Sequence, residues 1–193
     1  NVVVLVINWN GLAHLQHCLP SLIKTRYENL QVTVLDNGSS DGSQAWIKNH
    51  FPQIDLIALN DNLGFTGANN IGIHKAMQAG ADYVALLNND TRVEPDWLDA
   101  LVEVAERDPE IAICAAQQRT WDGECVIRFR FIPEWAEAEA VHIPVGTPDI
   151  VKPAPFASGC AMLLRCDILE QIGLFDDRYF AYVEDVDLTL RAW

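Results

Sequence analysis

The segment Asn1-Val2-Val3-Val4-Leu5-Val6-Ile7-Asn8-Trp9-Asn10-Gly11 opens this 193-residue chain and carries the clearest signal of its fold class. The continuous apolar, mostly β-branched run at residues 2–7 predicts a strand buried on both faces, which is typical of a parallel sheet. The polar residues at 8–11 come directly after it, where a strand ends. Apolar residues then recur at helical spacing, at Leu12, Leu15, Leu19, Leu22 and Ile23.

The alternation of strand and helix continues through the first two thirds of the chain. Further strands are expected at residues 31–35, 54–59, 83–87 and 111–116. The helices expected between them are one capped by Ser40 or Asp41, one over residues 68–79, and one with Pro95 in its first turn. Repeated β-α-β units with short connections predict an α/β fold with a mostly parallel central sheet and helices on both faces.

The alternation of strands and helices ends after Gln117. Residues 117–155 predict loops and a hairpin, because Trp, Pro and alternating polar and apolar residues replace the earlier pattern. A strand is expected at 157–164, then a short helix that begins at Asp167 and ends at Gly173, and a final helix from Glu184 onward.

The charge balance limits the classes of ligand. The chain has 27 acidic residues against 13 Lys and Arg, for a formal net charge of -14. Nucleic acid is therefore not an expected partner, because phosphate binding by charge needs a basic face. An anionic ligand would need a local offset, such as a metal ion, a helix N-terminus or a few arginines. The five cysteines form no CxxC pair and are expected to be reduced thiols of a cytoplasmic protein.

Polar residues follow each of the first four expected strands, at residues 8–11, 36–42, 60–65 and 88–90. Asn, Asp and Gly are good turn formers, which explains one or two such segments. Four in succession favour a binding crevice, because the carboxyl ends of parallel strands meet at one edge of the sheet and ligands bind there.

Each segment suits a particular chemistry. Asp36 can accept paired hydrogen bonds from a nucleobase or a ribose, or it can form a turn. The Gly- and Asn-rich segment 62–72 enters a helix whose N–H groups can face a phosphate. Asn88-Asn89-Asp90 suits Mg²⁺ or Mn²⁺, or a simple turn. Adjacent carboxylates at Glu184-Asp185 can supply a general base, or merely complement a helix dipole.

Together these segments resemble the inverting family 2 glycosyltransferases of GT-A fold, and most of all their bacterial rhamnosyltransferase-like branch. The closing motifs of the resemblance are Ser158-Gly159-Cys160-Ala161-Met162, Gly173-Leu174-Phe175-Asp176 and Phe180-x-Tyr182-x-Glu184-Asp185-x-Asp187-Leu188-x-x-Arg191. The likeness covers nearly the whole chain apart from residues 117–155.

The resemblance implies roles for individual residues. Asp36 would read the base or its ribose, and Asn88-Asn89-Asp90 would be this chain's form of the DXD motif, with Asp90 as the contact to Mg²⁺ or Mn²⁺ and Asn88 in place of the first carboxylate. Asp185 would be the base, with Glu184 beside it as the second catalytic carboxylate. The expected nucleotide and donor-binding residues are Asn8, Asn10, Asp36, Asn62, Gly64, Asn69, Asn88, Asn89, Ser158 and Gly159.

The resemblance also implies a complete reaction. A single GT-A domain over residues 1–193 would comprise a nucleotide-sugar half (1–116) and an acceptor and catalytic half (117–193) that lacks the family's C-terminal extension. It would move a sugar, with inversion, from a nucleotide-diphosphate sugar to a glycan or lipid-linked glycan acceptor in bacterial surface polysaccharide synthesis. The expected location is the cytoplasm, with association at the inner membrane face only through parts outside this chain.

Two other functions are open from the residues. A non-catalytic sugar-nucleotide binding module fits a chain without its full acceptor half. A nucleotidyltransferase shares the architecture and the metal, but it would be expected to carry a Gly-rich loop with Lys or Arg after the first strand, and Asn8-Trp9-Asn10-Gly11 has neither.

Overall fold

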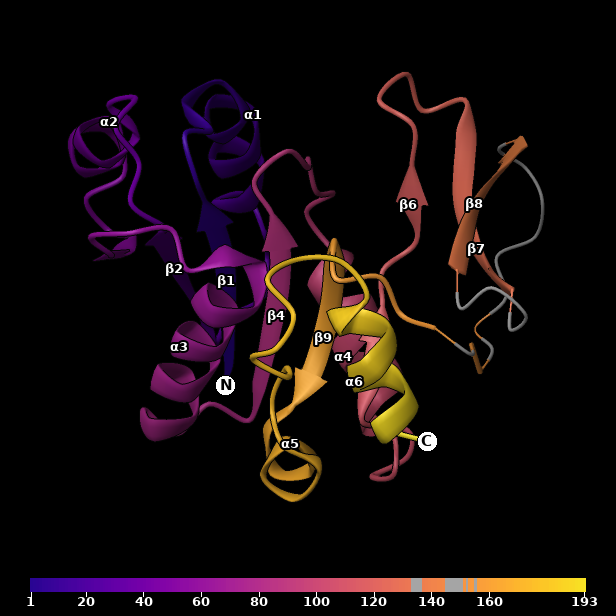
Figure 1. Ribbon diagram of the computed structural model, residues 1–193. Coiled ribbons are helices and arrows are strands. Elements are labelled where there is room, and N and C mark those ends of the chain that lie inside the picture. The colour runs from indigo at the N-terminus through magenta and orange to yellow at the C-terminus, as the bar shows by residue number, and fades with distance from the viewer. Residues whose placement is uncertain (133–136, 145–150, 152, 155) are drawn as a thin grey trace.

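The computed structural model of the protein describes residues 1–132, 137–144, 151, 153–154 and 156–193. A six-stranded sheet forms its centre, with the strand order β3-β2-β1-β4-β9-β5 (Figure 1). These strands are β1 (Val2–Asn8), β2 (Leu30–Asp36), β3 (Asp55–Ala58), β4 (Tyr83–Asn88), β5 (Ile113–Ala115) and β9 (Ala161–Arg165). Strands β1 to β4 pair in parallel, which confirms the predicted α/β class with a mostly parallel sheet.

Strand β9 is the antiparallel member of this sheet and lies between β4 and β5. The sequence predicts a strand in this region, but β9 begins at Ala161, four residues later than expected. The preceding residues Ser158-Gly159-Cys160 instead form a turn, and this turn lies beside the end of β4 because the Asn88 N–H donates to the Cys160 carbonyl at 2.8 Å. Because β9 is antiparallel, its first residue Ala161 pairs with Leu87, and the turn that precedes β9 therefore lies at the carboxyl edge of the parallel strands.

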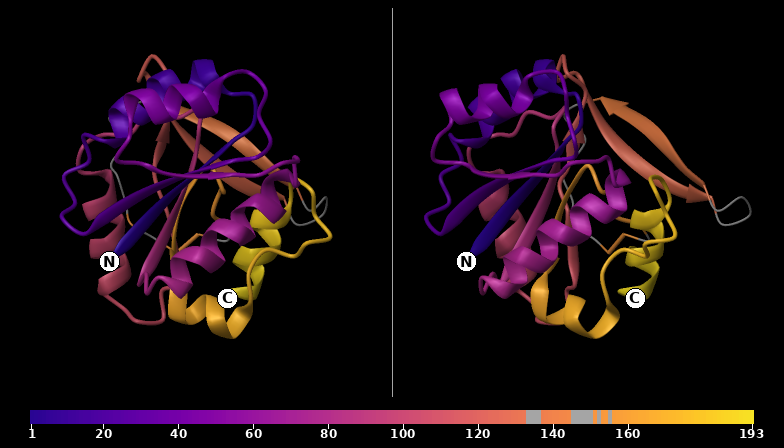
Figure 2. Two further views of the ribbon diagram at one scale, coloured as in Figure 1. Left: turned by 90° about the vertical axis from the view of Figure 1, so that its left-hand side faces the viewer. Right: turned by 60° about the vertical axis from the view of Figure 1, so that its left-hand side comes forward.

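Six helices of the described chain cover the sheet. They are α1 (Leu12–Leu22), α2 (Ser43–His50), α3 (Gly64–Gln78), α4 (Trp97–Glu106), α5 (Cys166–Ile172) and α6 (Glu184–Arg191). Helices α3, α5 and α6 lie on the face toward the viewer in Figure 1, and Figure 2 shows helices on both sides of the sheet. The predicted helices are thus present, with differences at their starts.

The differences at helix starts have local causes. Helix α3 begins at Gly64, not at Ala68, because its first amides find acceptors in neighbouring loops. Pro95 precedes α4, whose first residue is Trp97, so the prediction that Pro95 occupies the first turn is wrong. Helix α2 is capped at Gly42 in a left-handed conformation, and Asp41 accepts a hydrogen bond from the Ser43 N–H at 3.0 Å.

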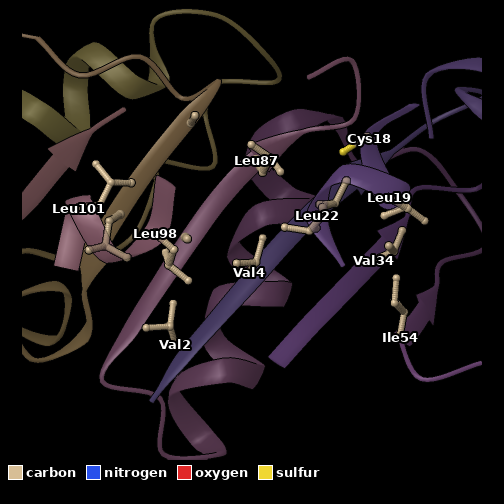
Figure 3. Close-up of a cluster of buried hydrophobic side chains, with 14 of the residues drawn as sticks. Val2, Val4, Cys18, Leu19, Leu22, Val34, Ile54, Leu87, Leu98 and Leu101 are labelled. Atoms are coloured by element: carbon tan, nitrogen blue, oxygen red, sulfur yellow. The ribbon is translucent and has the colours of Figure 1, made fainter. Parts of the chain in front are cut away.

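The core has two layers, because successive side chains of a strand point to opposite faces. Val2, Val4 and Val6 pack with Leu19 and Leu22 of α1 and with α4 (Figure 3). Val3 and Leu5 face the other way and pack with α3, α5 and α6. Burying each of these aliphatic side chains contributes about 1.5–3 kcal/mol. The continuous apolar run of β1 is therefore explained by burial on both faces.

A second sheet, with the order β6-β7-β8, comprises β6 (Gln118–Arg119), β7 (Cys125–Ile132) and β8 (Glu137–Pro144). Strands β7 and β8 pair antiparallel from Cys125–Pro144 to Ile132–Glu137, which confirms the predicted hairpin. In the right-hand view of Figure 2 the pair extends away from the central sheet.

Candidate active site

The strand register brings the polar strand ends to one edge. Asn8 is opposite Asp36 in the β1–β2 pair, and Asn88 is opposite Ile7 in the β1–β4 pair. Asn8 joins all three strand ends through its side-chain amide. Its Nδ2 donates to the Oδ2 of Asp36 at 2.9 Å, and its Oδ1 accepts from the Nδ2 of Asn89 at 2.8 Å. This buried amide fixes the loops after β1, β2 and β4 relative to one another.

Asp36 has no exposed surface, and both of its carboxylate oxygens are engaged. Besides the bond from Asn8, its Oδ1 accepts from the Ser39 N–H at 2.9 Å and from the Nε2 of Gln44 at 2.7 Å. A buried carboxylate needs such donors, since an unpaired one is strongly unfavourable. Asp36 is thus held by three protein donors, and in this structure it orders the loop that follows β2.

The loop after β1 presents a large aromatic surface. Asn10 adopts a left-handed conformation (φ 48°), which Asn tolerates well. Its N–H donates to the Oγ of Ser39 at 2.8 Å, and its Oδ1 accepts from the Ser40 N–H at 2.8 Å. Trp9 stands in the chain between Asn8 and Asn10, which are both hydrogen-bonded to the loop after β2, and Trp9 itself is 56% exposed. The sequence analysis did not select Trp9, because an isolated aromatic in a loop carries no signal of its own.

Asn62 and Gly64 belong to the start of α3. The Oδ1 of Asn62 accepts from the Gly64 N–H and from the Nδ2 of Asn37, both at 2.8 Å. The next amide, that of Phe65, donates to the carbonyl oxygen of Phe180 at 2.8 Å. The first amides of α3 therefore donate to protein acceptors, and the expectation that they are free to face a phosphate is wrong for these groups.

Asn69 lies one turn further along α3 and is buried, at 1% exposure. Its Nδ2 donates to the Phe65 carbonyl at 2.9 Å, while its Oδ1 has no partner among the described residues. Asn69 is thus buried like Asn8, but it lies within α3 and not at the strand ends that Asn8 connects.

Asp90 is exposed and lies close to the turn that precedes β9. Burial, and after it the negative charge of Asp90, raises the pKa of Cys160 to about 11. The backbone bond between Asn88 and Cys160 explains this proximity. The end of β4 and the 158–160 turn therefore lie side by side, with the Asp90 carboxylate near Cys160.

Asp185 is attached to the same turn. Its Oδ2 accepts from the Gly159 N–H at 3.0 Å, and its Oδ1 accepts from the Val186 N–H at 2.9 Å. A Cβ added to Gly159 would lie 3.2 Å from the Phe65 ring and 3.6 Å from the Oδ2 of Asp185, so this small residue permits close approach on both sides. Burial raises the pKa of the Asp185 carboxyl, while the two backbone donors counteract the rise. A half-buried carboxylate of raised pKa is suited to accept a proton.

Glu184 differs from its neighbour because it is only 5% exposed and its Oε2 has no hydrogen-bond partner among the described residues. Burial, and then the negative charge of Asp185, raises the pKa of Glu184. The two adjacent carboxylates therefore have different environments, one at the turn with Gly159 and one inside the protein.

A hydrogen-bonded path connects these groups along the sheet edge. It runs from Asp36 through Asn8 to Asn89, and from Asn88 through the 158–160 turn to Asp185. In the described part of the chain no cluster of three or more His, Cys, Asp or Glu side chains suits a metal ion. One exposed carboxylate flanked by amides nevertheless fits a hard cation that takes its other ligands from water and a diphosphate.

Residues missed by the sequence analysis hold this arrangement together. Asn37 bridges the ends of β2 and α3, because its Oδ1 accepts from the Leu63 N–H at 2.9 Å and its Nδ2 donates to the Gly64 carbonyl at 3.0 Å. Asn37 could have been selected from the sequence, because it directly follows Asp36 at the end of an expected strand. Phe180 stands in the closing motif of the resemblance, but no signal in the sequence indicated that its backbone carbonyl accepts from α3, a distant part of the chain.

Comparisons with known proteins agree with this geometry. The family model of Glycosyl transferase family 2 matches residues 3–173. N-acetylglucosaminyl-diphospho-decaprenol L-rhamnosyltransferase of Mycobacterium tuberculosis is 29% identical, over 97% of this chain and 69% of its own length. The O-antigen biosynthesis protein RfbC of Myxococcus xanthus is 26% identical, over 88% of this chain and 14% of its own length.

Solved structures show the same GT-A architecture. GalNAc-T7, with UDP, GalNAc and Mn²⁺, has a TM-score of 0.75 at 16% identity, over 100% of this chain and 40% of that one. Mannosyltransferase PcManGT from Pyrobaculum calidifontis, with GDP-Man and Mn²⁺, has a TM-score of 0.67 at 18% identity, over 97% of this chain and 50% of that one. The chain thus spans half or less of these two structures. Within the described residues, no helix has both the length and the apolar character needed to cross a bilayer.

Proposed function

The chain belongs to glycosyltransferase family 2, and from this we propose that it transfers a sugar from a nucleotide-diphosphate sugar to an acceptor hydroxyl with inversion at the anomeric carbon. The observation that carries the proposal is the Asp185 carboxylate, which is held by the Gly159 N–H at the carboxyl edge of the parallel strands and has a raised pKa. The names of the similar proteins support a role in the synthesis of a bacterial surface polysaccharide.

We assign donor binding to residues 1–116. Trp9 offers an exposed ring for stacking on a nucleobase, beside the loop that Asp36 orders. Asn8, Asn10, Asn62 and the Asn88-Asn89 pair hold the surrounding loops in register. Asn69 supports this region from inside α3, since its side chain is buried.

The donor set at Asp90 fits Mg²⁺ or Mn²⁺, with Asn88 beside it. When bound, such an ion supplies the positive charge that a nucleoside diphosphate needs in a protein of net charge -14. The presence of Mn²⁺ in the two similar structures supports this assignment. The chain's own contribution is to hold the Asp90 carboxylate beside the 158–160 turn.

We assign the acceptor side to residues 117–193. In a single displacement, Asp185 takes the proton of the acceptor hydroxyl as that oxygen attacks the anomeric carbon from the face opposite the leaving group. The Gly159 N–H fixes the carboxylate for this step, and Ser158-Gly159 border the reacting groups. Glu184 acts from within the protein, because its buried side chain favours a role in setting the position and charge of Asp185.

The rhamnosyltransferase name of the mycobacterial relative makes an L-rhamnosyl donor and an N-acetylglucosaminyl-diphospho-lipid acceptor the first pair to test. We place the reaction in the cytoplasm, which the five free thiols support. Attachment to the inner membrane face would come from parts outside this chain.

The decisive experiment compares Asp185→Asn with Asp187→Asn. Both residues lie in the first turn of α6, but Asp187 pairs with Arg191 and does not bind the 158–160 turn. Removal of a positioned base is expected to lower transfer by about 10²–10⁴-fold in Asp185→Asn. Asp187→Asn should retain most activity, and calorimetry should give both variants the wild-type affinity for the nucleoside diphosphate. If Asp185→Asn transferred sugar at nearly the wild-type rate, Asp185 would not be the general base.

A further inference from the structure

The loop of residues 174–183, called here the strap, leads from α5 to α6 and ends next to Glu184 and Asp185. In Figure 1 it passes in front of the central sheet before it enters α6. Its first part is fastened to α3 by Asn70. The Nδ2 of Asn70 donates to the Phe175 carbonyl at 2.9 Å and to the Oδ1 of Asp177 at 2.7 Å, while its Oδ1 accepts from the Phe175 N–H at 3.1 Å.

The second fastening is at Phe180. Its carbonyl accepts from the Phe65 N–H at 2.8 Å, which caps the start of α3. Its ring lies over Gly64, where an added Cβ would be 2.7 Å from the ring atom Cδ2. The strap is therefore held against α3 at Phe175, Asp177 and Phe180, only a few residues before Asp185.

The aromatic side chains of this fixed segment are nevertheless open to solvent. Phe180 is 63% exposed and Tyr182 is 85% exposed. Tyr182 and Val183 both have φ of 72°, in the left-handed region. This conformation is unusual for a bulky residue and a clear outlier for a β-branched one, and such outliers are concentrated at functional sites. The strained turn points the chain into α6 and leaves the Tyr182 ring uncovered three residues before the base.

We propose that Phe180 and Tyr182 form a binding surface for a pyranose ring of the acceptor. This inference rests on the proposed glycosyl transfer. An acceptor hydroxyl that gives its proton to Asp185 has to be carried by a ring beside that carboxylate, and the 158–160 turn already occupies the Oδ2 side. Aromatic rings bind the apolar C–H face of a sugar while its hydroxyls stay free for polar contacts. Two exposed rings in the segment that leads directly to the base meet this need.

The first test separates acceptor use from donor chemistry. The variants are Phe180→Ala, Tyr182→Phe, Tyr182→Gly and Tyr182→Ala, with Trp193→Ala as control because Trp193 is also exposed but follows the other end of α6. Transfer is measured to an N-acetylglucosaminyl-diphospho-lipid with a shortened chain, and donor hydrolysis is measured with water as the acceptor. We expect the acceptor KM to rise about tenfold in Phe180→Ala, Tyr182→Ala and Tyr182→Gly, equivalent to about 1.4 kcal/mol.

Donor hydrolysis should stay at the wild-type rate in the Tyr182 variants, and Tyr182→Phe should keep the wild-type KM. Tyr182→Gly guards against misfolding, since glycine adopts the left-handed backbone without strain. An unchanged KM in Tyr182→Gly would overturn the proposal. Parallel loss of hydrolysis and transfer would also overturn it, because the strap would then act on the whole site.

A second measurement needs no turnover. Saturation-transfer NMR with methyl N-acetylglucosaminide should detect ring contacts in the wild-type chain, and these should disappear in Tyr182→Gly but not in Trp193→Ala. If the chain neither transfers the sugar nor hydrolyses the donor, the proposed function is wrong. The NMR result still shows whether Phe180 and Tyr182 bind a sugar ring. No binding by the wild type, or a change of oligomeric state in Tyr182→Gly, would overturn the surface as a sugar site.

Discussion

Replacement of Gly64 by alanine tests how the strap is fixed to α3. Gly64 has φ of 75°, a left-handed conformation that alanine adopts with difficulty. A Cβ at this position would overlap the Phe180 carbonyl oxygen and lie 2.7 and 2.9 Å from two atoms of its ring. Ordinary carbon contacts are about 3.5–4.0 Å, so either the strap or the start of α3 has to move.

Gly42 supplies the matched control. It caps α2, has φ of 89°, and has no atom within 4 Å of the Cβ that a substitution would add. Gly42→Ala should therefore show the backbone effect alone: about 1–2 kcal/mol for the left-handed conformation, partly offset by about 0.4–1 kcal/mol from the stiffer unfolded chain. Gly64→Ala carries the same contribution and in addition about 1–3 kcal/mol for the overlap with Phe180.

Urea unfolding measures both variants. We expect Gly64→Ala to lower the free energy of unfolding by about 2–4 kcal/mol and Gly42→Ala by about 1 kcal/mol, with unchanged m-values. Because the strap leads to Asp185, Gly64→Ala should also lower glycosyl transfer, whereas Gly42→Ala should not. Equal losses of stability in the two variants would show that the Phe180 contact contributes nothing, and the account of the strap as a fixed element would fail.

Three other predictions concern the site itself. Since burial raises the pKa of Glu184 above its ordinary 4.5, the folded state binds this proton more tightly than the unfolded state, and wild-type stability should fall as pH rises from that value through the folded pKa. The fall should be smaller in Glu184→Gln, in which the raised pKa of Asp185 remains, and this variant should be more stable than the wild type near neutral pH. The same difference in free energy of unfolding between the two proteins at about pH 4 and at about pH 7, measured with urea, would contradict this. EDTA should weaken nucleoside diphosphate binding to the wild type and have no effect on Asp90→Ala, as measured by calorimetry; a metal-independent affinity of the wild type would argue against Asp90 as the ligand. Asn8→Ala leaves the buried Asp36 and the partly buried Asn89 without a shared partner and should cost about 3 kcal/mol, whereas Asn10→Gly, which keeps the left-handed backbone of this exposed residue, should cost about 1 kcal/mol; comparable values in thermal or urea unfolding would mean that the buried amide is not the key link.

Local patterns were enough to predict the α/β class and most of its elements. The apolar run of β1 and the leucine spacing of α1 depend on side-chain periodicity, which is a property of adjacent residues. The polar strand ends were also predictable as neighbours, because parallel strands in register place Asn8, Asp36 and Asn88 at one edge whatever the details of the loops. The family resemblance assigned Ser158-Gly159 to donor binding and Asp185 to the base, and the bond between Gly159 and Asp185 is consistent with one shared site.

The hydrogen-bond partners at the site did not follow from such patterns, because they come from segments far apart in the chain. Nothing near Phe180 indicates that its carbonyl caps α3, and nothing near Asp36 indicates that three donors surround it. The antiparallel insertion of β9 between β4 and β5 likewise depends on which sheet edge is open once the parallel strands have formed. The chain's local preferences thus specify which groups reach the edge of the sheet, while long-range packing specifies which of them are buried and paired and which, like Asp90, Asp185 and Tyr182, remain accessible to a ligand.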